Sequence, residues 1–307
     1  MDYKALVLKS FKLAWRYKWL WVFGLFAGGG GFSGGGNGGS FNFNNGSSHW
    51  NGNDSSVRID AFMRHVRDWA GAHIALIVGV ILAAMFLFLV MIVFSIIARG
   101  ALIGAAASLD QDEETSFGQS FKMGLHNFWS VFGFGLLLFL IIFAPVMLLI
   151  FIGVMAVLTV PLLLIFFVPL LLVFIPLAIA VSFISSLGLR FIVIDGRGAA
   201  AALGEGWRLM WRRLGPVVLT WLISVGLAIG FGMAVVIVLL ALLVPTGIAG
   251  YVAFRAGFSL LKLAVFVFIG LAIIAALLVV QGAFGAYHSV YWTLAFRQMR
   301  ALDADGD

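Results

Sequence analysis

Few side chains in this sequence have the types and spacing that catalysis would need. The chain has no cysteine, which excludes thiol chemistry, disulfides and cysteine-ligated zinc. Its histidines never recur at the i, i+3 or i, i+4 spacing that would place two metal ligands on one helix face. They are His49, His65, His73, His126 and His288. We therefore expect no metal site, no cofactor and no enzymatic activity, and an intramembrane enzyme is the least favoured of our hypotheses.

Basic side chains occur in two groups that could bind a negatively charged surface. One group recurs at helical spacing within residues 1–18, so its members share a face of a basic amphipathic helix. The other group precedes a long apolar run. These candidate contacts for anionic lipid are Lys9, Lys12, Arg16, Arg208, Arg212 and Arg213. Each Lys or Arg near an anionic leaflet contributes about 1 kcal/mol, although the same charges could serve only to orient the chain.

A weaker polar cluster lies near the end of the last apolar run. Tyr287, His288 and Tyr291 fall on adjacent turns of the helix expected there. They could contact a lipid headgroup or a substrate. The alternative is an aromatic belt at the membrane interface, where tyrosine is enriched in any membrane protein.

The composition places these residues in a membrane protein. Of the 307 residues, 63% are hydrophobic and only 10% are charged, whereas a soluble domain carries roughly 25% charged residues. Inside a bilayer, backbone polar groups must be satisfied within the segment, which favours α-helices. The sequence therefore predicts an all-α fold, a polytopic transmembrane helix bundle in a single domain over residues 1–307. No nucleic-acid partner is expected.

Apolar runs long enough to cross the hydrocarbon core, about 30 Å thick, predict six spans. They lie near residues 13–31, 74–98, 128–152, 161–189, 216–244 and 263–286. The first run is short, and it spans only if its helix extends back through Leu13 while Arg16 and Lys18 snorkel to the surface. A tight hairpin is expected near 153–161, and Pro245-Thr246-Gly247 is expected to form a turn.

Charge asymmetry favours six spans over five. With six spans, most Lys and Arg residues fall on the side that holds both termini, and with five they divide almost evenly. The positive-inside rule then places both termini in the cytoplasm. Residues 28–56 are rich in Gly, Asn and Ser and lack Lys and Arg, so we expect a flexible loop outside the cytoplasm. A short polar helix is expected at 57–69 and an acidic tail at 301–307.

The chain also reads as three tandem units of one amphipathic helix and one helical hairpin. Each unit opens with an aromatic-basic-aliphatic triplet and closes with an arginine followed by an acid. The triplets are Phe11-Lys12-Leu13, Phe121-Lys122-Met123 and Trp207-Arg208-Leu209, and the closing pairs are Arg99 with Asp110, Arg190 with Asp195 and Arg297 with Asp303. A true repeat implies three hairpins around a pseudo-threefold axis. The alternative is that any positive-inside hairpin places an arginine at its cytoplasmic end.

Several stretches resemble a group of uncharacterised bacterial membrane proteins. They are residues 15–21 leading into the Gly/Asn-rich loop, residues 190–195 followed by residues 207–209, and residues 291–297. These proteins are similar to the membrane domain attached to some glycerophosphodiester phosphodiesterases. The phosphodiesterase barrel itself is absent, so the resemblance implies no activity. It implies a bacterial cytoplasmic membrane and an association with lipid headgroups.

Two functional hypotheses follow. The first is a non-enzymatic membrane protein that uses its basic cytoplasmic face to bind anionic lipid or a protein partner. That partner could be a different protein or a second copy of the same chain. The second is a permease or lipid transporter that opens a path along the proline-kinked span at 161–189, where Pro169 and Pro176 each remove a backbone donor.

Overall fold

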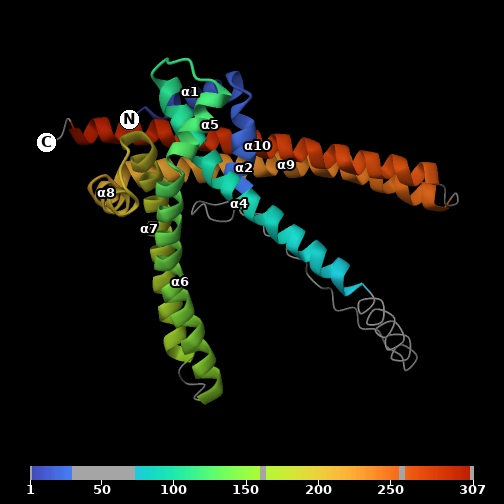
Figure 1. Cartoon of the computed structure of the whole chain (residues 1–307), viewed down its shortest axis with the longest axis horizontal. Coiled ribbons are helices and arrows are strands. Elements are labelled where there is room, and N and C mark those ends of the chain that lie inside the picture. The colour runs from blue at the N-terminus through green and yellow to red at the C-terminus, as the bar shows by residue number, and fades with distance from the viewer. Residues whose placement is uncertain (1, 30–72, 160–163, 256–259, 305–307) are drawn as a thin grey trace. The chain divides into compact units, whose positions relative to one another are not determined.

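The computed structural model describes residues 2–29, 73–159, 164–255 and 260–304. These residues form helices and contain no strand, which confirms the predicted all-α fold (Figure 1). In chain order the helices are α1 (Tyr3–Arg16), α2 (Leu20–Gly29), α4 (Ile74–Asp110), α5 (Phe117–His126), α6 (Phe128–Thr159), α7 (Leu164–Asp195), α8 (Ala199–Arg212), α9 (Leu214–Arg255) and α10 (Leu260–Ala304).

Five helices of the described residues are long and apolar enough to cross a membrane, namely α4, α6, α7, α9 and α10. The chain is therefore a multi-pass membrane protein. In the most apolar windows of α4, α9 and α10, none of the residues is buried inside the protein. Such bare apolar surface suits a lipid environment, where the hydrocarbon tails take the place of a protein core.

The predicted first span is wrong in its boundaries. The expected helix through Leu13 instead ends at Arg16, where the Tyr17 N–H donates to the Leu13 carbonyl oxygen, and α2 begins only at Leu20. The break is fixed by the Trp21 indole N–H, which donates to the Ala14 carbonyl oxygen at 2.8 Å. The ten described residues of α2 rise about 15 Å, which is half of the hydrocarbon thickness.

The predicted turn at Pro245-Thr246-Gly247 is also wrong, because α9 continues through it to Arg255. Proline is tolerated inside membrane helices where local side chains occupy the backbone groups it disturbs. Here the Thr246 hydroxyl donates to the Leu242 carbonyl oxygen at 2.7 Å. The hairpin expected near 153–161 does not form at residues 153–159, because α6 continues to Thr159, and the rest of that range lies outside the described residues.

Some expectations concern residues outside those described. The Gly/Asn-rich loop at 28–56 falls there except for its first two residues, as do the polar helix at 57–69 and the last three residues of the acidic tail. The chain divides into two compact units, one of Met1–Asn37 with Ser95–Asp307 and one of Gly38–Phe94. The described part of the second unit is the start of α4, whose side chains are almost all exposed.

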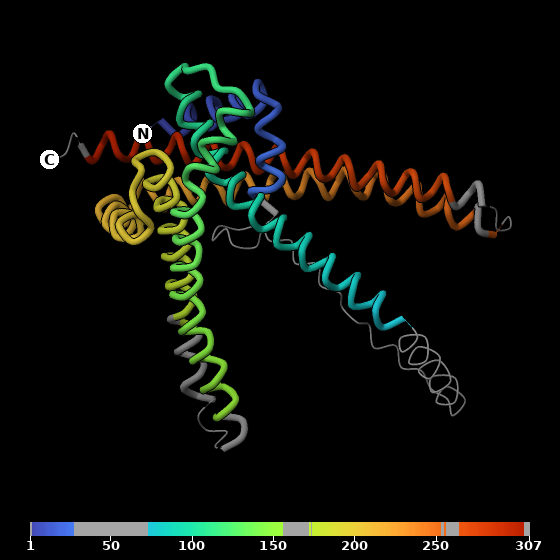
Figure 2. Tube along the Cα trace, viewed as in Figure 1, coloured from blue at the N-terminus to red at the C-terminus, as the bar shows by residue number. Residues whose placement is uncertain are grey.

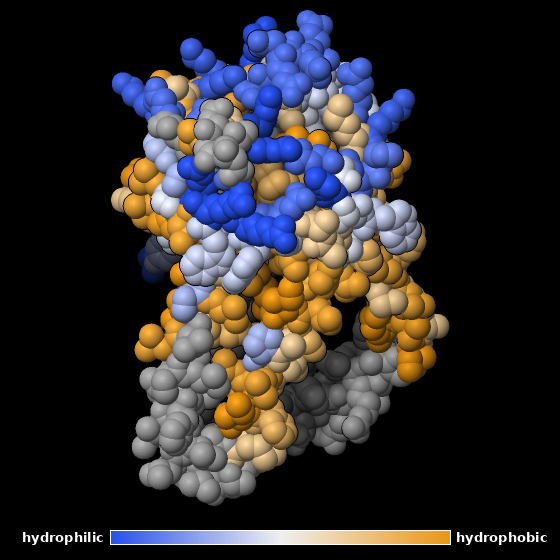
Figure 3. Space-filling model, turned by 90° about the vertical axis from the view of Figure 1, so that its left-hand side faces the viewer, coloured by the Kyte–Doolittle hydropathy of each residue, from blue (hydrophilic) through white to orange (hydrophobic). Residues whose placement is uncertain are grey.

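The larger compact unit, Met1–Asn37 with Ser95–Asp307, holds the hydrophobic core, which lies near one end of its membrane helices. Its buried residues come from the end of α4, the start of α6, the end of α7, the start of α9 and the end of α10, together with α1, α2 and α8. Within this unit α6 runs beside α7 and α9 runs beside α10 (Figure 2). On the face shown in Figure 3, hydrophilic side chains gather at one end and apolar side chains cover the surface below them.

The amphipathic helices α1, α5 and α8 each precede a membrane helix or α2, and they end in the same register. The residue after each helix donates its backbone N–H to a carbonyl four residues earlier, and these acceptors are Leu13, Met123 and Leu209. Those acceptors are the third members of the three triplets. A shared termination at a shared triplet position is what a three-unit repeat requires.

These amphipathic helices pack in a cyclic order. The α5 helix packs on α4, where a Cβ atom added to Gly124 would lie 2.2 Å from the Ile97 carbonyl oxygen. The α8 helix packs on α7, and the α1 helix packs on α10. Each therefore lies on the helix that ends another unit, and the contact of α1 with α10 closes the cycle. The residues before the three triplets, Ser10, Ser120 and Gly206, are all buried at these contacts.

Candidate lipid-headgroup site

Each amphipathic helix presents an aromatic side chain followed by a cation at the same place in the repeat. The pairs are Phe11-Lys12, Phe121-Lys122 and Trp207-Arg208, in which the three cations are exposed and Phe121 is partly buried. One turn later a second apolar-basic pair follows in each helix, namely Trp15-Arg16, Leu125-His126 and Trp211-Arg212. All six of these residues are exposed.

The opposite faces of the same helices explain this exposure. In α1, Leu6, Ser10 and Ala14 are buried, and in α8 the residues buried at the same spacing are Ala202, Gly206 and Met210. A buried stripe at i, i+4 and i+8 turns the intervening side chains outward. Partial burial also raises the pKa of the Tyr3 phenol above its usual 10.0. At neutral pH this phenol therefore stays uncharged, and Tyr3 adds no negative charge to α1.

The structure divides the six predicted lipid contacts into two sets. Lys9 pairs with Asp110 at 2.5 Å, and both Arg212 and Arg213 lie 3.6 Å from Asp303. Arg213 also donates to the Leu302 carbonyl oxygen at 2.6 Å. These three cations therefore serve at least partly to hold the fold together.

The other three predicted contacts face outward. Lys12, Arg16 and Arg208 are exposed, and none of them takes part in an ion pair within the described residues. The guanidinium of Arg16 lies 5.6 Å from the centre of the Tyr17 ring. Lys122 belongs to this outward set but was missing from the predicted contacts. Its place in the second triplet was the signal that could have identified it, because it matches Lys12 and Arg208.

The acids that close the three units bind cations from other elements. Asp110 accepts Lys9 and Arg297, Asp195 accepts Arg300, and Asp303 accepts the two arginines at the end of α8. Among the described residues, these acids pair with inward cations and with none of the outward ones. The exposed faces of α1, α5 and α8 therefore carry cations that have no ion-pair partner in the described part of the chain.

The polar cluster at Tyr287, His288 and Tyr291 does not form one exposed site. Tyr291 is fully buried, and its hydroxyl donates to the Thr220 carbonyl oxygen at 3.2 Å. Tyr287 stacks on Tyr291 and contacts Phe11. These tyrosines therefore join α10 to α9 and α1.

The imidazole of His288 instead packs beside Trp292, whose ring lies 5.9 Å from the Arg190 guanidinium. Arg190 is only 5% exposed. It donates to the Ser186 carbonyl oxygen of its own helix and to the Ser289 carbonyl oxygen of α10. Buried arginines in membrane proteins commonly find such backbone partners, and this one joins α7 to α10.

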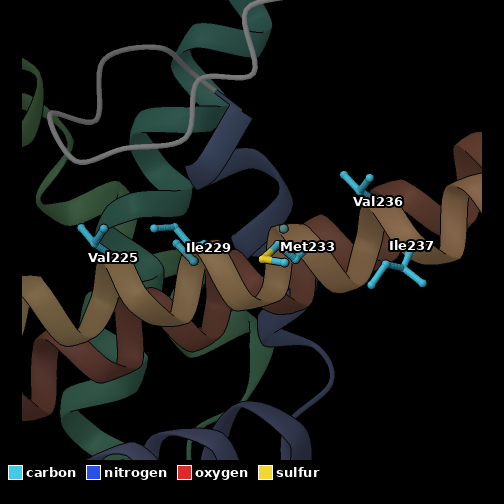
Figure 4. Close-up of a pocket in the computed structure, with 7 residues that line it drawn as sticks. Val225, Ile229, Met233, Val236 and Ile237 are labelled. Carbon is cyan, nitrogen blue, oxygen red and sulfur yellow. The ribbon is translucent and has the colours of Figure 1, made fainter.

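Two cavities differ in chemistry. A cavity of about 530 Å³ runs along α9 and is lined by apolar residues such as Val225, Ile229 and Met233 (Figure 4). A smaller cavity of about 270 Å³ is lined by Lys9, Asp110, Arg297 and Gln298 together with apolar residues. Within the described residues, no group of three or more His, Asp or Glu side chains is placed to hold a metal ion.

Comparison with known proteins places the chain in a family. No curated protein and no solved structure matches it. A model described as a family of unknown function, DUF7544, matches residues 6–302. This match includes the three triplets and nearly all of the described helical residues, and the chain therefore belongs to the DUF7544 family of unknown function.

Proposed function

We propose that this protein is a non-enzymatic protein of the bacterial cytoplasmic membrane that binds anionic phospholipids through the exposed faces of α1, α5 and α8. The observation that carries the proposal is the recurrence, at the same position of all three helices, of an aromatic side chain followed by an exposed cation that has no ion pair within the described residues. Phe11 with Lys12 and Trp207 with Arg208 are the two clearest pairs.

Elementary membrane chemistry supports this assignment. Aromatic rings are enriched at headgroup depth, where their apolar body and polar edge both find partners. A cation beside such a ring then lies in the layer of lipid phosphates, and each contributes about 1 kcal/mol. An amphipathic helix with aromatic and basic residues on its exposed side lies in the plane of the interface. The exposed faces of α1, α5 and α8 each combine these features, and we assign all three to contact with lipid headgroups.

We assign this surface to the cytoplasmic side. The starts of α6 and α9 and the ends of α7 and α10 belong to the same core as the amphipathic helices. Most Lys and Arg residues of the described chain are located at this end, and the positive-inside rule then places it in the cytoplasm together with both termini. A protein partner or a second copy on the same face remains a prediction.

The test compares two triple variants of the full chain. One replaces Lys12, Lys122 and Arg208 with glutamine, and the other exchanges Lys for Arg and Arg for Lys at the same positions, which keeps the charge. Native mass spectrometry after gentle extraction reports the retained phosphatidylglycerol relative to phosphatidylcholine. We expect the glutamine variant to lose phosphatidylglycerol by more than about 10-fold, from three contacts of roughly 1 kcal/mol each, and the exchange variant to retain it.

Equal retention by the two variants, in protein shown to be correctly inserted, would reject the proposal. The alternative is a permease or lipid transporter that works through α7. The two cavities described above are lined by residues of other helices.

A further inference from the structure

The three amphipathic helices differ in the residue that lies one turn after the triplet cation. This residue is Arg16 in α1, His126 in α5 and Arg212 in α8. Arg212 lies 3.6 Å from Asp303, whereas Arg16 has no ion pair within the described residues. Histidine is mostly uncharged near neutral pH. Within the described part of the chain, the face of α1 is therefore the one that combines two charged side chains without an ion-pair partner.

The two cations of the α1 face, Lys12 and Arg16, are held at a fixed spacing by their helix. Four residues of α-helix rise about 6 Å, and side chains at this separation have Cβ atoms about 5–6 Å apart. Both side chains are exposed, while the opposite side of α1 is buried and α1 packs on α10. The contact of Arg16 with the Tyr17 ring involves no carboxylate, so it cancels none of the charge. The α1 face thus offers two positive charges about one helical turn apart.

Two phosphates of a single headgroup match this pair of charges. One phosphate bound to Lys12 leaves Arg16 without a counter-charge, and a second phosphate supplies it. When the two phosphates are covalently linked, binding of the first raises the effective concentration of the second at the neighbouring cation. Cardiolipin has this chemistry, because its two phosphates are joined through one glycerol, and basic surfaces at the cytoplasmic side of membrane proteins bind its headgroup.

We propose that the exposed face of α1 binds the two-phosphate headgroup of cardiolipin, whereas the corresponding faces of α5 and α8 each bind a single phosphate. Lys12 binds one phosphate, as in the proposed function on which this inference rests, and Arg16 binds the other. The shared chemistry is a pair of phosphates on one glycerol, which dissolved glycerol 1,3-bisphosphate also offers.

The aromatic side chains beside these cations favour the lipid as the source. Phe11 and Trp15 each precede one of the two cations in the sequence, and they are 54% and 57% exposed. Their rings stack with centres 5.7 Å apart, so they form one accessible apolar surface next to the charges. A soluble bisphosphate gains nothing from this surface, whereas the glycerol backbones and upper acyl chains of a lipid can cover it.

The experiment uses purified full-length protein in nanodiscs at neutral pH. Phosphatidylcholine discs contain either cardiolipin or phosphatidylglycerol, mixed to equal lipid charge, and native mass spectrometry counts the lipids that the protein retains. The main variant is Arg16→Gln. Its matched control is Arg212→Gln, which removes one exposed positive charge at the same place in the repeat, but from a side chain that is paired with Asp303.

We expect Arg16→Gln to lower cardiolipin retention roughly fivefold, the factor that corresponds to about 1 kcal/mol for one cation near an anionic headgroup. Phosphatidylglycerol retention should stay the same, because Lys12 still binds its single phosphate. Arg16→Lys, which keeps the charge, and Arg212→Gln should both keep the wild-type preference for cardiolipin over phosphatidylglycerol.

A gain-of-function variant keeps the proposal testable if Arg16→Gln does not fold. His126 is exposed one turn after Lys122, at the place in α5 that corresponds to Arg16. His126→Arg therefore gives α5 the same two cations as α1. It should raise cardiolipin retention by a similar factor and leave phosphatidylglycerol retention unchanged.

The possible contrary results are distinguishable. Equal losses of the two lipids in Arg16→Gln, equal losses of cardiolipin in Arg16→Gln and Arg212→Gln, or a His126→Arg protein that gains no cardiolipin would each overturn the two-phosphate assignment alone. Efficient displacement of cardiolipin by dissolved glycerol 1,3-bisphosphate overturns the lipid as the source. A wild type that prefers neither anionic lipid to phosphatidylcholine overturns the proposed function itself.

Discussion

The Asp110 carboxylate at the end of α4 accepts a hydrogen bond from Arg297, which lies 187 residues later on α10. The same carboxylate also accepts Lys9 of α1. One acidic side chain thus joins α1 and α4, which open and close the first repeat unit, to α10, which closes the third repeat unit. It lies at the contact of α1 with α10 that closes the cyclic order of the amphipathic helices.

Replacing Asp110 with asparagine should therefore destabilise the protein. The change removes the negative charge between Lys9 and Arg297, whose side chains are partly buried beside it. We expect a loss of about 2 kcal/mol in the free energy of unfolding, as for a hydrogen bond to a charged group. Thermal unfolding in a mild detergent is the measurement.

The matched control for that variant is Glu205→Gln. It breaks the pair of Arg197 and Glu205, which is 3.2 Å long and largely exposed. Exposed pairs contribute less than about 1 kcal/mol. Similar losses of stability in the two variants would show that Asp110 does not hold α1, α4 and α10 together.

A second prediction concerns the contact of α5 with α4. Gly124→Ala should destabilise the protein by about 2 kcal/mol through overpacking, because its Cβ atom would lie 2.2 Å from the Ile97 carbonyl oxygen. Gly118→Ala lies on the same helix with no neighbouring atom within 4 Å and should be neutral or stabilising, since Ala is the better helix former. In detergent, the thermal midpoint of Gly124→Ala should fall while that of Gly118→Ala stays the same or rises, and an equal fall in both would contradict the packing described here.

The sequence predicts the membrane helices of this protein well because apolar length is a strong signal. The run at 74–98 predicts α4, but this helix extends further, to Asp110. The run at 263–286 predicts α10, and the continuation of that helix to Arg300, which the sequence also predicts, is confirmed, since α10 ends at Ala304. The α4 extension carries Arg99, a charge that usually marks the end of a span. It remains helical because its inner face joins the core, as Leu109 does, and this packing is not visible in a linear pattern.

The candidate site is predictable only in part for a similar reason. The triplets identify the register of Lys12, Lys122 and Arg208, because helical spacing and the repeat are local features. The pairing of Lys9 with Asp110 joins residues 101 positions apart. Spacing along one helix cannot show such a partner, so the sequence places Lys9, Arg212 and Arg213 in the same group as cations that face outward.

Topology provides a third prediction that benefits from the absence of native cysteine. Ala200, which is exposed on α8, should be protected as a cysteine variant from an impermeant thiol reagent added to intact cells. Ser40, in the loop without Lys or Arg that the charge pattern places outside, should react as a cysteine variant. Labelling at Ala200 with protection at Ser40 would invert the proposed orientation.

The last prediction separates the cations that hold the fold from those that face lipid. A double variant with glutamine at Arg212 and Arg213 removes the ion pairs with Asp303, and it should lose about 1 kcal/mol of stability. It should lose less phosphatidylglycerol than a double variant with glutamine at Lys12 and Arg208, whose cations have no ion pair within the described residues. That second variant should keep its thermal midpoint.

Because each double variant removes two positive charges, net charge cannot explain a difference between them. Thermal unfolding and native mass spectrometry on the same preparations measure stability and lipid retention together. At high salt, the Lys12 and Arg208 variant and the wild type should retain nearly the same amount of phosphatidylglycerol. The reason is that exposed charges are screened over about 10 Å at 0.1 M salt and over shorter distances at higher concentrations. If instead both variants lose lipid and stability in parallel, the lipid loss is a consequence of unfolding, and the division of these cations into two roles is wrong.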